Sequence, residues 1–156
     1  MSEDITIRLA TVDDAPIIVH HRRAMFFDMG HTDPAALDAM DVSFTPYVAR
    51  GLSNGLYRGW LAHTSGGRVV AGGGLIVHEW PSGPVNPAEP RRAYILNVYT
   101  EPEYRGRGIA RRILTAIVEW CRAQGFRSIS LHASVLGQPL YASMGFEPTN
   151  EMRLKL

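Results

Sequence analysis

The fold is decided by one short stretch, Tyr104-Arg105-Gly106-Arg107-Gly108-Ile109-Ala110, which lies between a strand-like run and a long helical run. Backbone N–H groups in the first turn of a helix have no partner within the helix, and the helix dipole favours negative charge beside them. Glycine removes the side chains that would keep phosphate oxygens away from the backbone. The stretch therefore predicts an anion site that suits a pyrophosphate. The alternative is a solvated, arginine-rich turn whose glycines serve only its tight geometry.

The same stretch disfavours two common nucleotide motifs. It contains no Gly-Lys-Ser or Gly-Lys-Thr, so a Walker-type phosphate loop is not indicated. It also lies late in the chain, and no acidic strand end follows it, which disfavours a dinucleotide-binding unit. By itself, the loop could still bind a nucleotide or the pyrophosphate of coenzyme A.

Composition predicts a soluble, single-domain protein covering residues 1–156. The chain is 46% hydrophobic and 20% charged, as in ordinary globular proteins. A formal net charge of +1 gives no reason to expect nucleic-acid binding. There is no apolar run of the length that crosses a membrane and no signal-peptide pattern at Ser2-Glu3-Asp4, so we expect a cytoplasmic protein without membrane contact. The single cysteine, Cys121, lies on the apolar face of a predicted helix and is expected to be a core residue.

Periodicity predicts a mixed α/β sheet in one domain, in the order β-α-α-β-β-β-α-β-α-β. A capping-box-like start at Thr11 and Asp14 begins the first helix. The second helix should run from about 34 to 49, with a turn at 51–55, and the proline-rich segment 81–90 should be a loop. The predicted strands are 5–9, 56–64, 68–80, 93–99, 126–133 and 151–156. A long helix begins at Ile109, shows helical spacing of apolar residues to Cys121 and has Gly125 as its C-terminal cap, and a short helix covers 137–143.

The glycine stretch and its context resemble the GNAT superfamily of acyl-CoA N-acyltransferases over nearly the whole chain. Arg105-Gly106-Arg107-Gly108-Ile109-Ala110 matches the signature Arg/Gln-x-x-Gly-x-Gly/Ala of that family, and it follows a strand at 95–100. The resemblance implies a mostly antiparallel central sheet of six to seven strands flanked by about four helices. It also implies that the loop backbone binds the coenzyme A pyrophosphate, while the strand edge at Val98, Tyr99 and Thr100 binds the pantetheine arm.

A second segment, Ala133-Ser134-Val135-Leu136-Gly137-Gln138-Pro139-Leu140-Tyr141-Ala142-Ser143-Met144-Gly145-Phe146, resembles the part of the family in which a strand ends and a Leu-Tyr-x-x-x-Gly-Phe helix follows. By this resemblance, Tyr141 would lie beside the acyl-CoA sulfur and protonate the departing thiolate. A phenol suits this role because it is protonated at neutral pH and is a hydrogen-bond donor. Ser134 stands where the family often has an asparagine that binds coenzyme A. The alternative for Tyr141 is an amphipathic core tyrosine.

The implied reaction is direct transfer of an acetyl group from acetyl-CoA to a primary amine of a small molecule or peptide. The alternative is a non-catalytic acyl-CoA-binding sensor module, which has no need of an acid at the sulfur. Several members of the family carry a glutamate base on a central strand, but here Ile129 and Asn97 occupy plausible inward positions. His78 and Glu79 are therefore the leading candidates for a base. His132 and Glu101 are weaker candidates, and no base is needed if the amine arrives neutral.

The resemblance places the acceptor beside the first two helices, whose junction contains Phe27, Met29 and His31 as candidate substrate-binding residues. Single helix-end aromatics are more often core residues. His20 and His21 are adjacent and project in different directions, so no metal site is expected. The 81–90 loop either covers the acceptor site or contacts a second subunit of a homodimer, and the sequence leaves both open.

Overall fold

The computed structural model describes residues 3–156 of the protein. Met1 and Ser2, and with them part of the segment for which no signal-peptide pattern is predicted, lie outside the described residues. The strands are β1 (Ile5–Leu9), β2 (Tyr57–Thr64), β3 (Val69–Glu79), β4 (Arg91–Thr100) and β5 (Ser130–Leu131). The helices are α1 (Ala15–Asp28), α2 (Pro34–Asn54), α3 (Ile109–Ala123) and α4 (Gln138–Ser143). Short 3-10 turns at Val12–Asp14 and Pro102–Tyr104 precede α1 and the glycine loop.

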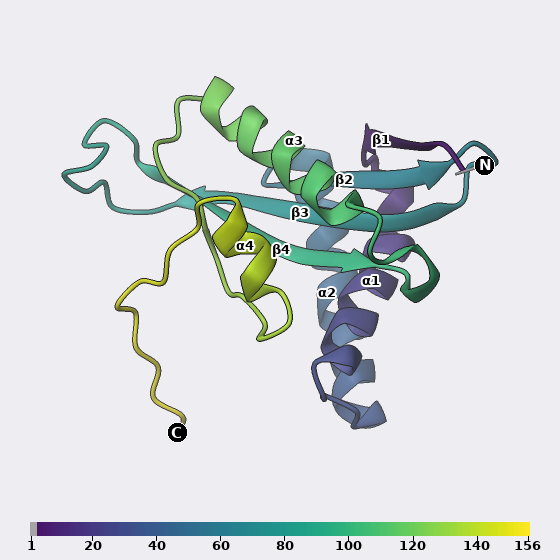
Figure 1. Cartoon of the computed structure of the whole chain (residues 1–156). Coiled ribbons are helices and arrows are strands. Elements are labelled where there is room, and N and C mark those ends of the chain that lie inside the picture. Colours follow the sequence, from purple (N-terminus) through teal and green to yellow (C-terminus); the bar gives the residue numbers. More distant parts are fainter. Residues whose placement is uncertain (1–2) are drawn as a thin grey trace.

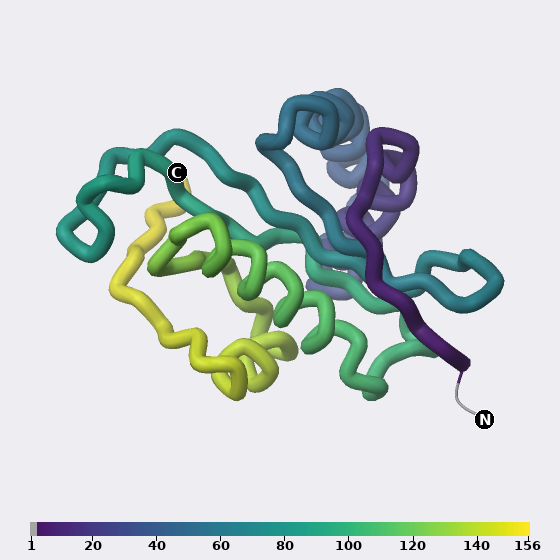
Figure 2. The backbone as a smooth tube through the Cα atoms, turned by 90° about the horizontal axis from the view of Figure 1, so that it is seen from above, coloured from purple at the N-terminus to yellow at the C-terminus, as the bar shows by residue number. Residues whose placement is uncertain are grey.

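The strands form one sheet in the order β1-β2-β3-β4-β5. The first three pairings are antiparallel and the pairing of β4 with β5 is parallel, so the predicted mixed, mostly antiparallel sheet is confirmed. Helices α1 and α2 cover one face of the sheet, and α3 and α4 cover the other (Figures 1 and 2). Each face has its own apolar core, because β-strand side chains alternate between the two faces.

The sheet is smaller than the resemblance implied. Within residues 3–156 it has five strands, not six to seven, and β5 has two residues where the pattern predicted 126–133. The predicted final strand at 151–156 is wrong, because this segment is irregular. Its alternating apolar side chains do not pack into a core, because Met152 is 94% exposed and Leu154 is 81% exposed. Alternation alone does not form a strand when no neighbouring edge pairs with it.

The second helix is longer than predicted. Instead of turning at 51–55, α2 continues to Asn54 and ends at Gly55, whose φ of 83° is a left-handed cap. Gly51 lies inside the helix for a packing reason, because a Cβ at this position would lie 2.5 Å from the Cβ of Tyr57. The glycine that suggested a turn therefore allows α2 to approach the start of β2. Other predicted features are confirmed: Thr11 N–H donates to Asp14 Oδ2 at 2.8 Å, and Cys121 is buried in the α3 core.

Three consecutive glycines at the centre of β3 bring the helices close to the sheet. A Cβ at Gly72 would lie 2.9 Å from His21 Nδ1 of α1, and a Cβ at Gly73 would lie 2.8 Å from Ile113 Cγ2 of α3. At Gly74 it would overlap the hydroxyl group of Tyr57. Glycine inside a strand weakens the strand but permits this close approach. Side chains on both faces of the sheet therefore approach the backbone of β3 closely, beside the middle of β4.

Candidate active site

A β-bulge interrupts β4 opposite these glycines. The register between β3 and β4 shifts between Gly72 and Gly74, so that Asn97 and Val98 together oppose Gly73. Asn97 has a φ of 56°, and it is the only residue other than glycine in 3–156 with a positive φ. Asparagine adopts the left-handed region more readily than most residues. A bulge of this kind adds one residue and bends the strand.

The extra residue reverses the side-chain alternation of β4. Before the bulge, Ile95 packs into the core beneath α3. After it, Val98 packs against that core, while Tyr99 lies against His21 of α1 with ring centroids 5.3 Å apart. The bulge therefore determines which side chains of β4 face α1 at the strand's carboxyl end.

The pairing between β4 and β5 ends just before the bulge. The two strands pair only through Tyr94 with Ser130 and Ile95 with Leu131, and β4 continues to Thr100. Among the described residues, no strand pairs with this side of β4 beyond Ile95. In Figure 1, β4 leads into the loop before α3. An unpaired strand edge offers backbone donors and acceptors to an extended ligand.

The glycine loop lies directly beyond this free edge. Gly106 and Gly108 have φ values of 74° and 73°, and a Cβ at either position would meet no atom within 4 Å. Within residues 3–156, the backbone N–H groups of Gly106, Arg107 and Gly108 have no acceptor. Gly108 immediately precedes α3, so these donors lie at the positive end of a 15-residue helix. The loop is therefore open in space and polarised for an anion.

The two loop arginines point back onto the protein. Arg105 pairs with Asp28 Oδ2 at 2.6 Å and donates through Nε to the Thr100 carbonyl at 2.9 Å. Arg107 donates to the Glu103 carbonyl at 2.9 Å and stacks over the ring of Tyr104. Their side chains fix the loop between β4 and the end of α1, so the loop presents its backbone to an incoming anion.

Tyr141 and Ser134 lie on the α3 side of the sheet. The Tyr141 ring packs edge-on to Phe146 at 5.8 Å, and burial raises the pKa of its phenol. The phenol therefore keeps its proton throughout the neutral range. The Ser134 hydroxyl accepts the Gly137 N–H at 3.1 Å, and the Ser134 carbonyl accepts from Gln138 at 3.0 Å. Ser134 thus forms the turn into α4, and its hydroxyl proton is free to donate.

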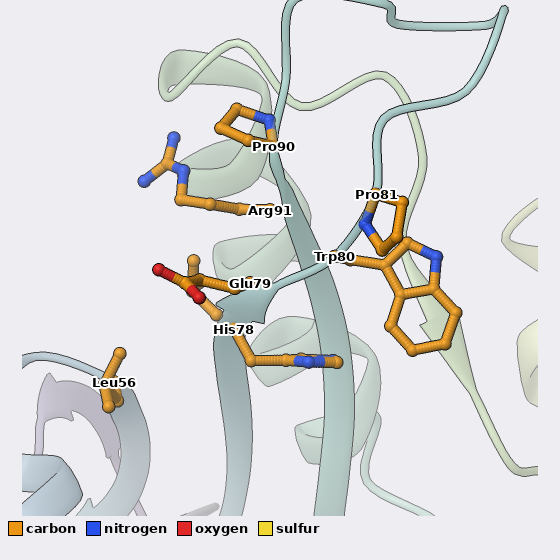
Figure 3. A pocket seen from close by; sticks show the side chains of 8 residues that line it. Leu56, His78, Glu79, Trp80, Pro81, Pro90 and Arg91 are labelled. Carbon is orange, nitrogen blue, oxygen red and sulfur yellow. The ribbon is translucent and has the colours of Figure 1, made fainter.

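The structure does not bring His78 and Glu79 together with the glycine loop. Both line an open cavity of about 680 Å³ at the other end of the sheet, where Trp80, Pro81 and Arg91 also lie (Figure 3). Glu79 faces Arg91 at the start of β4, five residues along β3 from Gly74 at the bulge. At about 3.3 Å per residue this is roughly 17 Å. Figure 3 also shows the two side chains pointing to opposite sides of β3. The structure therefore places both side chains well away from the bulge and the glycine loop.

The two weaker base candidates are engaged elsewhere. The Glu101 carboxylate accepts from His20 Nε2 at 3.0 Å beside the end of β4. His132 Nε2 lies 2.8 Å from Arg153 Nη2 in the C-terminal segment. Of the predicted acceptor residues, Phe27 and Met29 are 54% and 47% exposed, and His31 is also exposed. Phe27 lies at the end of α1, and Met29 and His31 follow the helix. Asp28, the last residue of α1, pairs with Arg105.

Sequence reasoning missed a buried polar cluster at the bulge. The Asn97 amide donates to the Tyr57 hydroxyl at 3.0 Å, and its oxygen accepts from Arg22 Nη1 at 2.7 Å. Asn97 is 3% exposed, and burial raises the pKa of Tyr57 to about 12. The signal was available in part, because an asparagine within a strongly strand-forming run often marks a bulge or turn. Nothing in the sequence indicated that Arg22 would meet it.

His21 is a second buried polar group on this face. Its side chain is 1% exposed between Gly72 and Tyr99, and its Nε2 has no hydrogen-bond partner among the described residues. Burial, with a smaller contribution from His20, lowers the pKa of His21 to about 4. The imidazole is therefore neutral in the folded protein at neutral pH.

No group of three or more His, Cys, Asp or Glu side chains in residues 3–156 could hold a metal ion. The described helices include none with the length and apolar character needed to cross a membrane.

Comparison with known proteins identifies the family. Residues 22–146 match the model of the acetyltransferase (GNAT) family. The chain is 38% identical to a GCN5-related N-acetyltransferase from Ralstonia eutropha JMP134, covering 98% of this chain and 99% of that one with a TM-score of 0.92. It is 31% identical to a predicted acetyltransferase from Clostridium acetobutylicum, whose structure was determined with acetyl-CoA, over 98% and 96% of the two chains with a TM-score of 0.87.

Curated relatives agree on the family. An uncharacterized N-acetyltransferase of Bacillus subtilis (strain 168) is 30% identical over 72% of this chain and 69% of its own length. N-acetyltransferase 8 of Rattus norvegicus is 30% identical over 59% of this chain, and the match spans only 40% of that longer protein. The protein belongs to the acetyltransferase (GNAT) family.

The buried His21 predicts a pH-dependent stability. The unfolded chain binds a proton at the ordinary histidine pKa of 6.5, whereas the folded chain does so only near 4. Between these values the unfolded state binds more protons, so the free energy of unfolding should fall as the pH drops from about 6.5 to about 4. The full effect is on the order of 3 kcal/mol.

Urea denaturation at several pH values measures this slope. In His21→Phe the contribution of this residue to the slope should disappear. The control His63→Gln keeps His21 and should keep the slope. An unchanged slope in His21→Phe would contradict the assignment.

Proposed function

We propose that the protein transfers the acetyl group of acetyl-CoA to a primary amine of a small molecule or peptide by direct attack. The observation that carries this proposal is the unpaired edge of β4, which begins after Ile95, passes the bulge and leads directly into the open glycine loop. These two features match the two parts of coenzyme A. The pantetheine arm carries amide groups that suit a free strand edge, and the pyrophosphate suits the N-terminus of α3.

In this arrangement the ligand binds along β4 in a defined direction. The pyrophosphate contacts the backbone N–H groups of Gly106 to Gly108, and the arm extends back along Thr100, Tyr99 and Val98. The thioester then lies beside Asn97, where β4 leaves β5. Support comes from the Clostridium acetobutylicum protein, which shares the fold at 31% identity and whose structure was determined with acetyl-CoA.

The chemistry needs few groups from the protein. The nitrogen lone pair of a neutral amine attacks the thioester carbonyl carbon, and backbone N–H groups at the bulge stabilise the oxyanion. When the C–S bond breaks, the sulfur takes the phenol proton of Tyr141. The nitrogen loses its extra proton to water, and the tyrosinate regains one from water. Burial keeps Tyr141 protonated until the thiolate forms beside it.

The role of Tyr141 is tested by Tyr141→Phe, which removes the acid and keeps the ring. We expect kcat to fall by roughly 10²-fold or more, while the Kd for acetyl-CoA changes less than about twofold. Turnover is measured by titrating the released thiol, and binding by calorimetry. Tyr94→Phe, which removes a phenol from the part of β4 that still pairs with β5, should keep full turnover. A Tyr141→Phe enzyme with normal kcat would exclude Tyr141 as the acid.

The loop assignment is tested by Gly108→Glu, which adds bulk and negative charge to the phosphate site and should abolish acetyl-CoA binding. Gly125→Glu is a matched control, because Gly125 also has a positive φ, of 87°, and has open space around it at the other end of α3. Both variants carry the same strain and charge, so calorimetry should show lost binding only in Gly108→Glu. Normal binding by a folded Gly108→Glu protein would contradict the assignment.

The same thiol assay distinguishes an enzyme from the alternative, a non-catalytic acyl-CoA sensor. An enzyme releases coenzyme A faster when a panel of amines is added. Stabilisation by acetyl-CoA against heat, without amine-dependent release from any amine in the panel, would instead support a binding module.

A further inference from the structure

Arg22 carries a charge that no acidic group neutralises in the described part of the chain. Among residues 3–156, no carboxylate lies within ion-pair distance of its guanidinium. The neighbouring Arg23 differs, because it pairs with Asp38 at 2.9 Å and with Asp41 at 2.7 Å. Burial lowers the pKa of Arg22, which means that its surroundings disfavour the charge they contain.

The guanidinium is nevertheless held firmly. Its central carbon lies 4.9 Å from the ring centre of Phe26 and 4.8 Å from that of Phe44, and Nη1 donates to Asn97 Oδ1 at 2.7 Å. Two cation–π contacts and one short hydrogen bond leave the group little freedom. A charged group held in place before a ligand arrives loses little entropy when it binds one.

One edge of the guanidinium is unsatisfied. Nε is buried and has no hydrogen-bond partner in the described part of the chain. Nη2 also has no hydrogen-bond partner within residues 3–156. Unlike Nε, it is accessible to solvent. Nε and Nη2 form the edge through which arginine binds a carboxylate with two parallel hydrogen bonds. A carboxylate at Nη2 would complete this edge once neighbouring side chains admit its second oxygen to Nε.

The position of this edge links it to the reaction. Arg22 contacts the side chain of Asn97, the bulged residue beside which the proposed thioester lies. A group bound to Arg22 therefore stands on the α1 side of the bulge, within the length of a small molecule from the thioester. In an amino acid, the carboxylate and the amine are separated by one or a few carbon atoms.

We propose that the acceptor is an amine that also carries a carboxylate, such as an amino acid or a close derivative, and that Arg22 binds this carboxylate while the amine faces the thioester. This inference rests on the proposed acetyl transfer and specifies its substrate class. A purely structural Arg22, which only holds Asn97, would give the protein no preference between an amino acid and its amide.

The test compares each acceptor with its uncharged counterpart. Wild-type enzyme is assayed with L-amino acids, β-alanine and 4-aminobutyrate, and with the amide of each. We expect kcat/KM to be at least about tenfold higher for the best amino acid than for its amide. In Arg22→Gln this ratio should approach one, whereas Arg22→Lys should keep part of it. The control Arg23→Gln, which removes the adjacent paired arginine, should retain the full ratio.

The readouts separate a specificity role from loss of structure. Thermal unfolding and acetyl-CoA affinity report whether each variant folds, and the amide substrates report whether its remaining machinery works. Equal falls for amino acid and amide in Arg22→Gln would indicate a structural role and overturn the inference. So would a wild-type enzyme that accepts amides equally well, or a panel in which no amino acid is bound or acetylated.

A binding experiment distinguishes failure of the carboxylate site from failure of the proposed acetyl transfer. Calorimetry of the protein saturated with coenzyme A measures amino-acid binding without turnover. Binding that prefers the carboxylate and is lost in Arg22→Gln, but without acetyl transfer to any amine, would contradict the proposed transferase and leave the carboxylate site in place. Acetyl transfer to amines without carboxylate preference would contradict the carboxylate site alone.

Discussion

The left-handed backbone of Asn97 is the constraint on which the rest of this structure depends. A single extra residue in β4 changes which face of the sheet the later side chains of the strand occupy. It lies directly after the part of β4 that pairs with β5. The conformation is held from both sides of the amide, by Arg22 at the oxygen and Tyr57 at the nitrogen. Glycines in β3 provide the space for Tyr57 and for His21 beside it. The bulge and the free edge of β4 therefore lie together at the carboxyl end of the strand.

The bulge also divides the sheet into two functional ends. At the carboxyl end of β4, the free edge, the glycine loop and the start of α3 follow one another along the chain, so an extended anionic ligand meets them in sequence. At the other end, the cavity lined by His78 and Glu79 is separated from these groups by half of β3. In our proposal the acceptor binds on the α1 side of the bulge, where Arg22, which has no carboxylate partner within residues 3–156, donates to Asn97.

Local patterns in the sequence predict much of this arrangement. The glycine loop, the α3 core face and the strand before them have strong periodicity and distinctive turn residues, and all were found where predicted. The errors have physical causes. Gly51 looked like a turn because its packing partner, Tyr57, is visible only in three dimensions. The 151–156 segment alternates but has no edge to pair with. The distance of His78 and Glu79 from the bulge depends on strand register, which their residue types and their place at a strand end do not reveal. The contact between Arg22 and Asn97 joins residues 75 positions apart, and no local pattern predicts it.

Hydrogen–deuterium exchange with and without acetyl-CoA tests the central claim most directly, because it reports on backbone amides at both ends of the sheet in one experiment. The account predicts that acetyl-CoA slows exchange in peptides covering 97–110, where the free edge of β4 and the glycine loop lie, and leaves peptides covering 78–91 unchanged. Protection confined to 78–91, with none at 97–110, would contradict it and move the coenzyme site to the opposite end of the sheet.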